Sequence, residues 1–180
     1  MRTPVPPLAG RSGGFTLIEA LIALVVLSVG LLGIASLQTS AMRYTHTSNV
    51  QAQAAVLAQN MIDRIRANPE ALDAGLFNDV YLDADPGSSV DCSTDPCNST
   101  ELAEYDLQQW YLLLSQTLPS GQGEIECLAT PLTSCRPGET DQPFAIIVRW
   151  DGFGTGATGT GCDVDNPDDL LCHRVVFVPL

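Results

Sequence analysis

Six cysteines are the residues of this chain best able to form disulfides or to bind a metal ion. They are Cys92, Cys97, Cys127, Cys135, Cys162 and Cys172. An even number of cysteines behind a hydrophobic segment is typical of disulfides made in an oxidising compartment. Buried free thiols are the alternative, and zinc is disfavoured because no C-x-x-C pair occurs. Pairing of sequence neighbours, each bounded by turn-prone residues, predicts Cys92–Cys97, Cys127–Cys135 and Cys162–Cys172.

One carboxylate, Glu19, stands inside an otherwise uncharged hydrophobic run from Phe15 to Leu37. As a helix this run would be about 34 Å long, enough to cross a hydrocarbon core of about 30 Å. An ionised carboxylate in a membrane span costs roughly 2.5–3.5 kcal/mol on insertion scales. Because residues that costly usually have a partner, we expect Glu19 to have one.

The remaining polar side chains predict no catalytic residue, no cofactor and no metal site. His46 and His173 have no Ser or Cys partner in any recognisable motif, so a structural role is expected for both. The acidic segment 163–169 supplies several hard oxygens of the kind that Ca²⁺ prefers. It lacks the Gly and the distal Glu of an EF-hand loop, which favours a solvated acidic loop. The sequence therefore predicts a protein that is not an enzyme.

Charge is abundant but unevenly distributed along the 180 residues. The formal net charge is −13, and the eight cations, all Arg, are not clustered. This excludes DNA or RNA as the main partner, because phosphate binding needs clustered cations. Charge is nearly absent from residues 12–42 and dense from residue 63 onward, which separates a membrane part from a soluble part.

The segment before the hydrophobic run predicts the topology. Residues 1–14 carry Arg2 and Arg11 and no acid. Positive flanks stay in the cytoplasm, so the C-terminal bulk should face the periplasm. A secretory signal peptide would have a shorter apolar core and a small-residue cleavage site. A buried core helix is rarely so uniformly apolar, and a plain membrane anchor leaves Glu19 unexplained.

The helical pattern continues beyond Leu37. Residues 38–68 contain no Pro or Gly, and one apolar stripe recurs at helical spacing, formed by Val50, Ala54, Leu57, Met61 and Ile65. Asp63, Arg64 and Arg66 lie away from it. Pro69 should end the helix, because the residue before a proline is pushed out of the α region. One helix from about Thr16 to about Ala67, roughly 78 Å long, is expected.

The C-terminal part predicts a small α+β domain. Residues 70–100 are expected to form a connecting loop. A short amphipathic helix should follow, with a capping box at Asn98 and Glu101 and an apolar face formed by Ala103, Leu107, Trp110 and Leu114. Three strands are expected, at Glu124–Ala129, Phe144–Trp150 and Arg174–Val178. Alternation in the second strand suggests that one of its faces covers the long helix.

The segment Gly13-Gly14-Phe15-Thr16-Leu17-Ile18-Glu19 resembles the cleavage and methylation motif of type IV prepilins. The resemblance implies that prepilin peptidase cuts between Gly14 and Phe15 and that Phe15 is then N-methylated. Glu19 falls on the acidic position of the family, which implies pairing with the new amine of a neighbouring subunit. It also implies a pilin-like fold, with a leader at 1–14, an assembly helix at 15–37, an amphipathic continuation at 38–68 and a periplasmic head at 69–180.

Two further stretches are similar to PilV-type minor pilins. Ser36 stands where major pilins commonly carry a proline, in the run from Ser28 to Gln38. The segments Tyr105–Trp110 and Leu118–Gly123 are similar to the PilV helix and its exit. This implies a non-enzymatic pilus subunit of the inner membrane and then the pilus. The expected partners are the peptidase, other minor and major pilins and the inner-membrane assembly platform.

Three other functions compete with this prediction. A type II secretion minor pseudopilin shares the same anchor but is usually shorter and poorer in cysteine. A tip adhesin would be a binding module whose surface loops recognise a receptor. A membrane-anchored periplasmic enzyme would need a catalytic constellation, which the sequence lacks.

Overall fold

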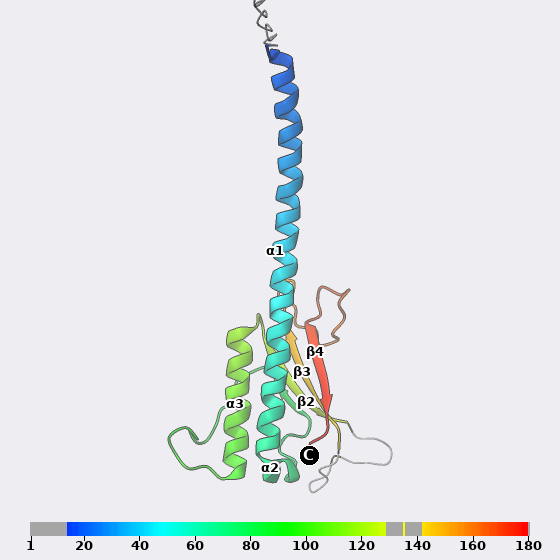
Figure 1. The fold of residues 1–180 in the computed structure, drawn as a ribbon. Coiled ribbons are helices and arrows are strands. Elements are labelled where there is room, and N and C mark those ends of the chain that lie inside the picture. Colours follow the sequence, from blue (N-terminus) through cyan, green and yellow to red (C-terminus); the bar gives the residue numbers. More distant parts are fainter. Residues whose placement is uncertain (1–13, 129–134, 136–141, 180) are drawn as a thin grey trace, which may run out of the picture. The chain divides into compact units, whose positions relative to one another are not determined.

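The computed structural model describes residues 14–128, 135 and 142–179. Along the chain it contains three helices and four strands (Figure 1): α1 (Leu17–Ala67), α2 (Pro69–Asp73), β1 (Val80–Leu82), α3 (Ser99–Thr117), β2 (Gln122–Cys127), β3 (Phe144–Trp150) and β4 (Leu171–Phe177). The chain divides into two compact units, residues 1–45 and residues 46–180. This is the expected α+β arrangement, a long apolar N-terminal helix packed on a small antiparallel sheet.

The first unit is the apolar part of α1. Its large hydrophobic side chains, from Leu17 to Leu37, are exposed. Within the described residues α1 is the one helix long and apolar enough to cross a membrane. The helix runs through Gly30 and Gly33 without a break. Exposed apolar side chains on every face of a helix require an apolar surrounding, either lipid or other helices.

The second unit begins with the amphipathic part of α1. The stripe expected at Val50, Ala54, Leu57, Met61 and Ile65 is confirmed, because all five side chains are buried. Two more buried residues, Ala58 and Ile62, widen it. The helix ends at Ala67, as the following Asn68-Pro69 predicted. This half of α1 is therefore the central helix of the head's hydrophobic core.

The prediction of a plain loop over residues 70–100 is wrong. Asn68 starts a second helix, α2, because its side-chain oxygen accepts a hydrogen bond from the Ala71 amide and Pro69 fits the first helical turn. Residues 80–82 then form β1, which pairs antiparallel with β2. Three residues are too few to show a strand periodicity, and α2 is little more than one turn.

Helix α3 confirms the predicted amphipathic helix and its capping box. The Asn98 side chain accepts from the Thr100 and Glu101 amides, and the Glu101 carboxylate accepts from the Asn98 amide. Ala103, Trp110 and Leu114 are buried, and Leu107 packs partly buried against the core. The Trp110 indole N–H donates to the Leu57 carbonyl of α1 at 2.9 Å. This bond joins the two helices inside the core.

The four strands form one antiparallel sheet in the order β1-β2-β3-β4. Two strands differ from the predicted ranges. β2 begins at Gln122 rather than Glu124, and the predicted end at Ala129 lies outside the described residues. β4 begins three residues before Arg174, because Leu171 pairs with Trp150 of β3, and it ends at Phe177.

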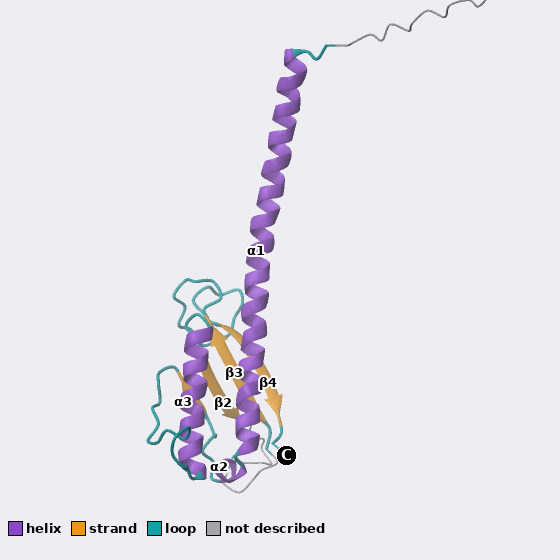
Figure 2. Cartoon of the chain, turned by 60° about the vertical axis from the view of Figure 1, so that its left-hand side comes forward, coloured by secondary structure: helices purple, strands orange, loops and turns teal. Residues whose placement is uncertain are grey.

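One face of β3 covers the long helix, as predicted, and the other face is covered as well. All seven residues from Phe144 to Trp150 are buried. One face packs on the core shared with α1 and α3, which lie side by side on that side of the sheet (Figure 2). On the other face Arg149 pairs with Glu124 of β2 and lies over the Tyr81 ring, 5.8 Å from its centre.

Candidate assembly and processing site

The helix that carries Glu19 begins directly after the predicted cleavage point. The Glu19 amide donates to the Thr16 hydroxyl oxygen at 3.3 Å, and the Ala20 amide donates to the Thr16 carbonyl at 3.2 Å. Thr16 is therefore the N-cap of α1. Sequence reasoning missed this role, although Thr16-x-x-Glu19 has the spacing of a capping box and would have revealed it.

The predicted scissile bond lies outside the helix. Gly14, Phe15 and Thr16 adopt no regular structure, and among the described residues, chain neighbours aside, no heavy atom lies within 4 Å of the position that a Cβ on Gly14 would take. A protease needs an extended and uncrowded backbone at the bond that it cuts. A glycine next to that bond favours both properties, because it has no side chain. The described residues around the predicted cleavage point are thus uncrowded, and cleavage there stays a prediction. Gly13 and the rest of the predicted leader lie outside the described residues.

Glu19 lies in the first turn of α1 and is exposed. Its carboxylate is near the positive end of the helix dipole, where an acidic group is favoured. Phe15, four residues earlier, is also exposed. The structure contains one chain, so the pairing of Glu19 with the amine of another subunit's Phe15 stays a prediction.

Hydroxyl groups in the first unit bond within α1. Ser28, Thr39, Ser40 and Thr45 each donate to the carbonyl four residues earlier, at 2.6, 3.0, 3.2 and 2.9 Å. Such bonds give each hydroxyl a hydrogen-bond acceptor within its own helix. A polar group in a membrane needs such a partner, because no water is present there. At Gly30 and Gly33 no heavy atom lies near an added Cβ, so both leave room for close approach by another helix.

The head carries three disulfides, and they join the predicted partners. Cys92 bonds to Cys97, Cys127 to Cys135 and Cys162 to Cys172, with Cα atoms 5.5, 6.1 and 5.4 Å apart. Each closes a short loop next to a regular element. The first precedes the cap of α3, the second begins at the last residue of β2 and the third ties the acidic segment to β4. The head therefore depends on an oxidising compartment for its complete covalent structure.

Asp151 organises the loop between β3 and β4. Its carboxylate accepts four backbone hydrogen bonds, from Phe153, Gly154, Thr155 and Gly156, at 2.8–3.2 Å. Desolvation by burial opposes its ionisation, but the bonds from Gly156, Thr155, Gly154 and Phe153 together outweigh it and lower the pKa of Asp151.

The acidic segment 163–169 belongs to the same loop. Its Asp163 and Asn166 side chains accept backbone N–H groups of Asp165 and Asp168. Within the part of the chain that the structure describes, no group of three His, Cys, Asp or Glu side chains is placed to hold a metal ion. His46 is exposed on α1, and His173 is half-buried on β4.

Comparison with known protein families gives two adjoining matches. Residues 10–35 match the family model described as the prokaryotic N-terminal methylation motif. Residues 36–108 match the Tt1218-like model, described as type IV pilin Tt1218. No curated protein and no solved structure matched the chain.

The two matches meet inside α1, so they follow the helix from its cap into the head and on to α3. The first covers the segment in which Gly14 and Phe15 precede a capped apolar helix with Glu19 in its first turn. A membrane-anchored pilin of this kind is processed by prepilin peptidase and assembles with other pilins. The chain belongs to the type IV prepilins.

Proposed function

We propose that this chain is a non-enzymatic PilV-type minor pilin that takes part in priming type IV pilus assembly or in the complex at the pilus tip. The observation that carries the proposal is the unbroken course of α1 through Ser36. At this position of the mature chain, major pilins commonly have a proline, which kinks a helix because it removes a backbone hydrogen bond. Here the Ser36 carbonyl also accepts the Ser40 hydroxyl.

The segment Leu118–Gly123 supports the proposal from the head. It links α3 to β2, and both of its glycines lie where a side chain would collide. A Cβ on Gly121 would lie 2.2 Å from the Leu114 carbonyl oxygen, and one on Gly123 would lie 2.5 Å from the Trp110 ring. The residues that resemble the PilV helix and the segment after that helix thus pack together around Trp110.

The proposed topology has residues 1–14 in the cytoplasm, residues 15–37 in the inner membrane and then in the filament core, and residues 69–180 in the periplasm. Residues 38–68 continue the helix into the head. The proposal rests on the basic leader with Arg2 and Arg11 and on the three disulfides beyond the span. The proposed partners are prepilin peptidase, other minor and major pilins and the inner-membrane assembly platform.

Deletion of the gene tests the proposal, with surface pili, twitching and protein secretion as the readouts. A minor pilin predicts fewer or no surface pili and lost twitching, with secretion unchanged and full recovery on complementation. Lost secretion with normal pili would identify a type II secretion pseudopilin instead. Normal pili with lost attachment to a surface would identify a tip adhesin.

A further inference from the structure

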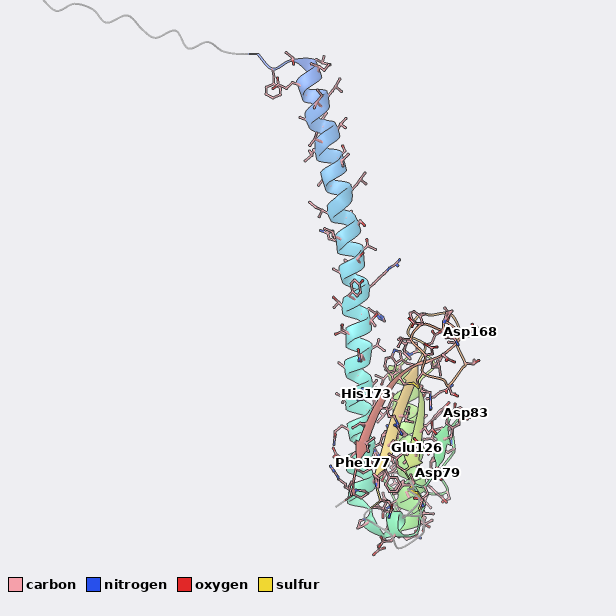
Figure 3. The ribbon with its side chains drawn as sticks, turned by 90° about the vertical axis from the view of Figure 1, so that its right-hand side faces the viewer. Asp79, Asp83, Glu126, Asp168, His173 and Phe177 are labelled. Atoms are coloured by element: carbon pink, nitrogen blue, oxygen red, sulfur yellow. A yellow bond between two sulfur atoms is a disulfide. The ribbon has the colours of Figure 1, made fainter. Side chains whose placement is uncertain are left out.

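The sheet of the head has two unequal edges. β1 is three residues long, whereas β4 at the opposite edge is seven residues long and pairs with β3 at every position from Leu171 to Phe177. Figure 3 shows β4, with His173 and Phe177, at one margin and Asp79 and Asp83 beside the other. Within the described part of the chain, no backbone group from outside the sheet bonds to β4. Among the described residues, the outer side of β4 is therefore an unpaired strand edge.

β4 lacks the features that protect edge strands from pairing with other chains. Natural edges are usually short, bulged, or marked by Pro or Lys. β4 has no bulge in its register and no Pro or Lys in its sequence. Its one Arg, Arg174, bonds to Glu126 of β2 at 2.8 Å and so lies over the sheet face. Val176 is 52% exposed, and such β-branched side chains favour strand pairing.

The sheet topology specifies what can pair with this edge. All neighbouring strands are antiparallel and their number is even, so β1 and β4 run in opposite directions. A second head in the same orientation, placed beside β4, would present its own first edge strand antiparallel to β4. Pilins anchored in one membrane have the same orientation. We propose that the β4 edge binds the first edge strand of a neighbouring pilin and extends its sheet, an inference that rests on the proposed function.

The neighbour is a different pilin rather than a second copy of this chain. The first strand here, Val80–Leu82, is less than half as long as β4 and leaves most of the edge unpaired. The charged side chains beside β4 indicate which residue types the partner strand carries. Arg66 lies over the Phe177 ring at 5.6 Å, whereas Arg174, three residues before Phe177, is already paired with Glu126. The Arg66 cation beside the Phe177 end of the edge favours an acidic partner strand at that end.

Photo-crosslinking in living cells tests the pairing. A photoreactive phenylalanine analogue replaces Val176 in one strain and Tyr81, on the β1 edge, in a second. The expected result is an adduct from position 176 that joins this chain to a second protein with a processed pilin N-terminus. Position 81, which is 41% exposed, should give no adduct with a pilin. A pilin adduct from position 81 alone, or an adduct between two copies of this chain from position 176, would overturn the inference.

A substitution pair provides an independent measurement. Val176→Glu places a negative charge on the β4 edge strand, and Val164→Glu places the same charge on an exposed loop position. Hydrogen exchange of the purified full-length protein verifies that the β4 amides bonded to β3 stay protected in both variants. Val176→Glu should lower the yield of surface pili at least about five-fold, about 1 kcal/mol of pairing, because it faces an acidic partner strand with a like charge. Val164→Glu should match the wild type. Equal piliation in the two variants would contradict the inference.

The two proposals fail in different ways. If deletion of the gene leaves pili intact, the minor-pilin function itself is wrong. If deletion abolishes pili but Val176→Glu has no effect, the function stands and the β4 edge is not the contact.

Discussion

At the scale of single residues, the start of α1 combines a helix cap with an acidic side chain in an apolar segment. Thr16 caps the helix and Glu19 occupies its first turn, so the dipole supplies part of the stabilisation of the carboxylate. A dipole end is only a partial charge and does not offset the full cost of an unpaired carboxylate in a membrane. The predicted cleavage after Gly14 would create a cationic amine on Phe15, the complementary full charge.

Glu19→Ala should separate processing from assembly. We expect normal cleavage after Gly14, insertion that is unchanged or slightly easier, and loss of entry into the pilus, because the pairing carboxylate is gone. Glu19→Gln keeps the size and removes the charge, so it should behave in the same way. The measurement is the amount of processed protein in the inner membrane and of surface pili, in a deletion strain. Wild-type piliation at equal protein level would show that Glu19 has no essential cationic partner. Its carboxylate would then be stabilised by water near the lipid headgroups.

Asp151 gives a prediction on the loop between β3 and β4. Asp151→Asn replaces one of the accepting oxygens with an amide group, so at least one of the four N–H groups loses its acceptor. The expected cost is about 1–3 kcal/mol. Faster hydrogen exchange at Gly154 and Gly156, with β3 amides as the internal control, checks it.

The pH dependence of this loop follows from the lowered pKa of Asp151. A carboxyl group whose pKa is lower in the folded state stabilises the fold above its ordinary pKa, about 4. That stabilisation is lost as pH falls through the lowered folded value. Exchange at Gly154 and Gly156, corrected for intrinsic rates, should therefore rise at acidic pH in the wild type and stay flat in Asp151→Asn.

At the scale of elements, α1 and α3 are held together by a partly buried ion pair as well as by Trp110. Arg64 donates to the Asp106 carboxylate, and both side chains are mostly buried. Arg64 was expected to lie away from the apolar stripe, and it does, but it faces α3 rather than open solvent. Burial raises the pKa of Asp106, and Arg64 opposes that shift.

Arg64→Ala should destabilise the head, because it leaves Asp106 buried without its cation. Breaking a buried pair costs about 3–5 kcal/mol, and less is expected here because Arg64 is a quarter exposed. The raised pKa of Asp106 should rise further. Stability of the variant should then fall as pH increases through that value, the opposite sign to Asp151. Thermal unfolding at several pH values measures this, with Asp63→Ala on the exposed face as the control. Equal loss in both variants would contradict the prediction.

The elements differ in how far the sequence predicts them. The stripe from Val50 to Ile65 repeats over four turns, so its burial could be read from its period. The box at Asn98 and Glu101 is a local interaction and needs no knowledge of the fold. β1 is short, and what stabilises it is its pairing with β2, which lies some 40 residues later in the chain. The Asp151-Gly152 dipeptide indicates a turn, but it does not reveal that one carboxylate accepts four backbone amides there.

At the scale of the whole molecule, maturation is expected to change both the length and the charge of the chain. Cleavage after Gly14 should leave a protein that begins with N-methyl-Phe15. Its formal net charge should move from −13 to −15, because Arg2 and Arg11 leave with the leader. Mass spectrometry of membrane-extracted protein checks both points, with a strain lacking the peptidase as the control. An intact N-terminus in cells with active peptidase would contradict the prediction.

The two tryptophans have an optical consequence. Both belong to the head, where Trp110 and Trp150 are almost completely buried, and the membrane helix contains none. Ultraviolet excitation at the red edge of aromatic absorption therefore reports on the head alone, even in vesicles or detergent. A buried indole emits at shorter wavelength than a hydrated one. The emission maximum of the intact membrane protein thus provides a label-free measure of whether its head is folded, without removal of its anchor.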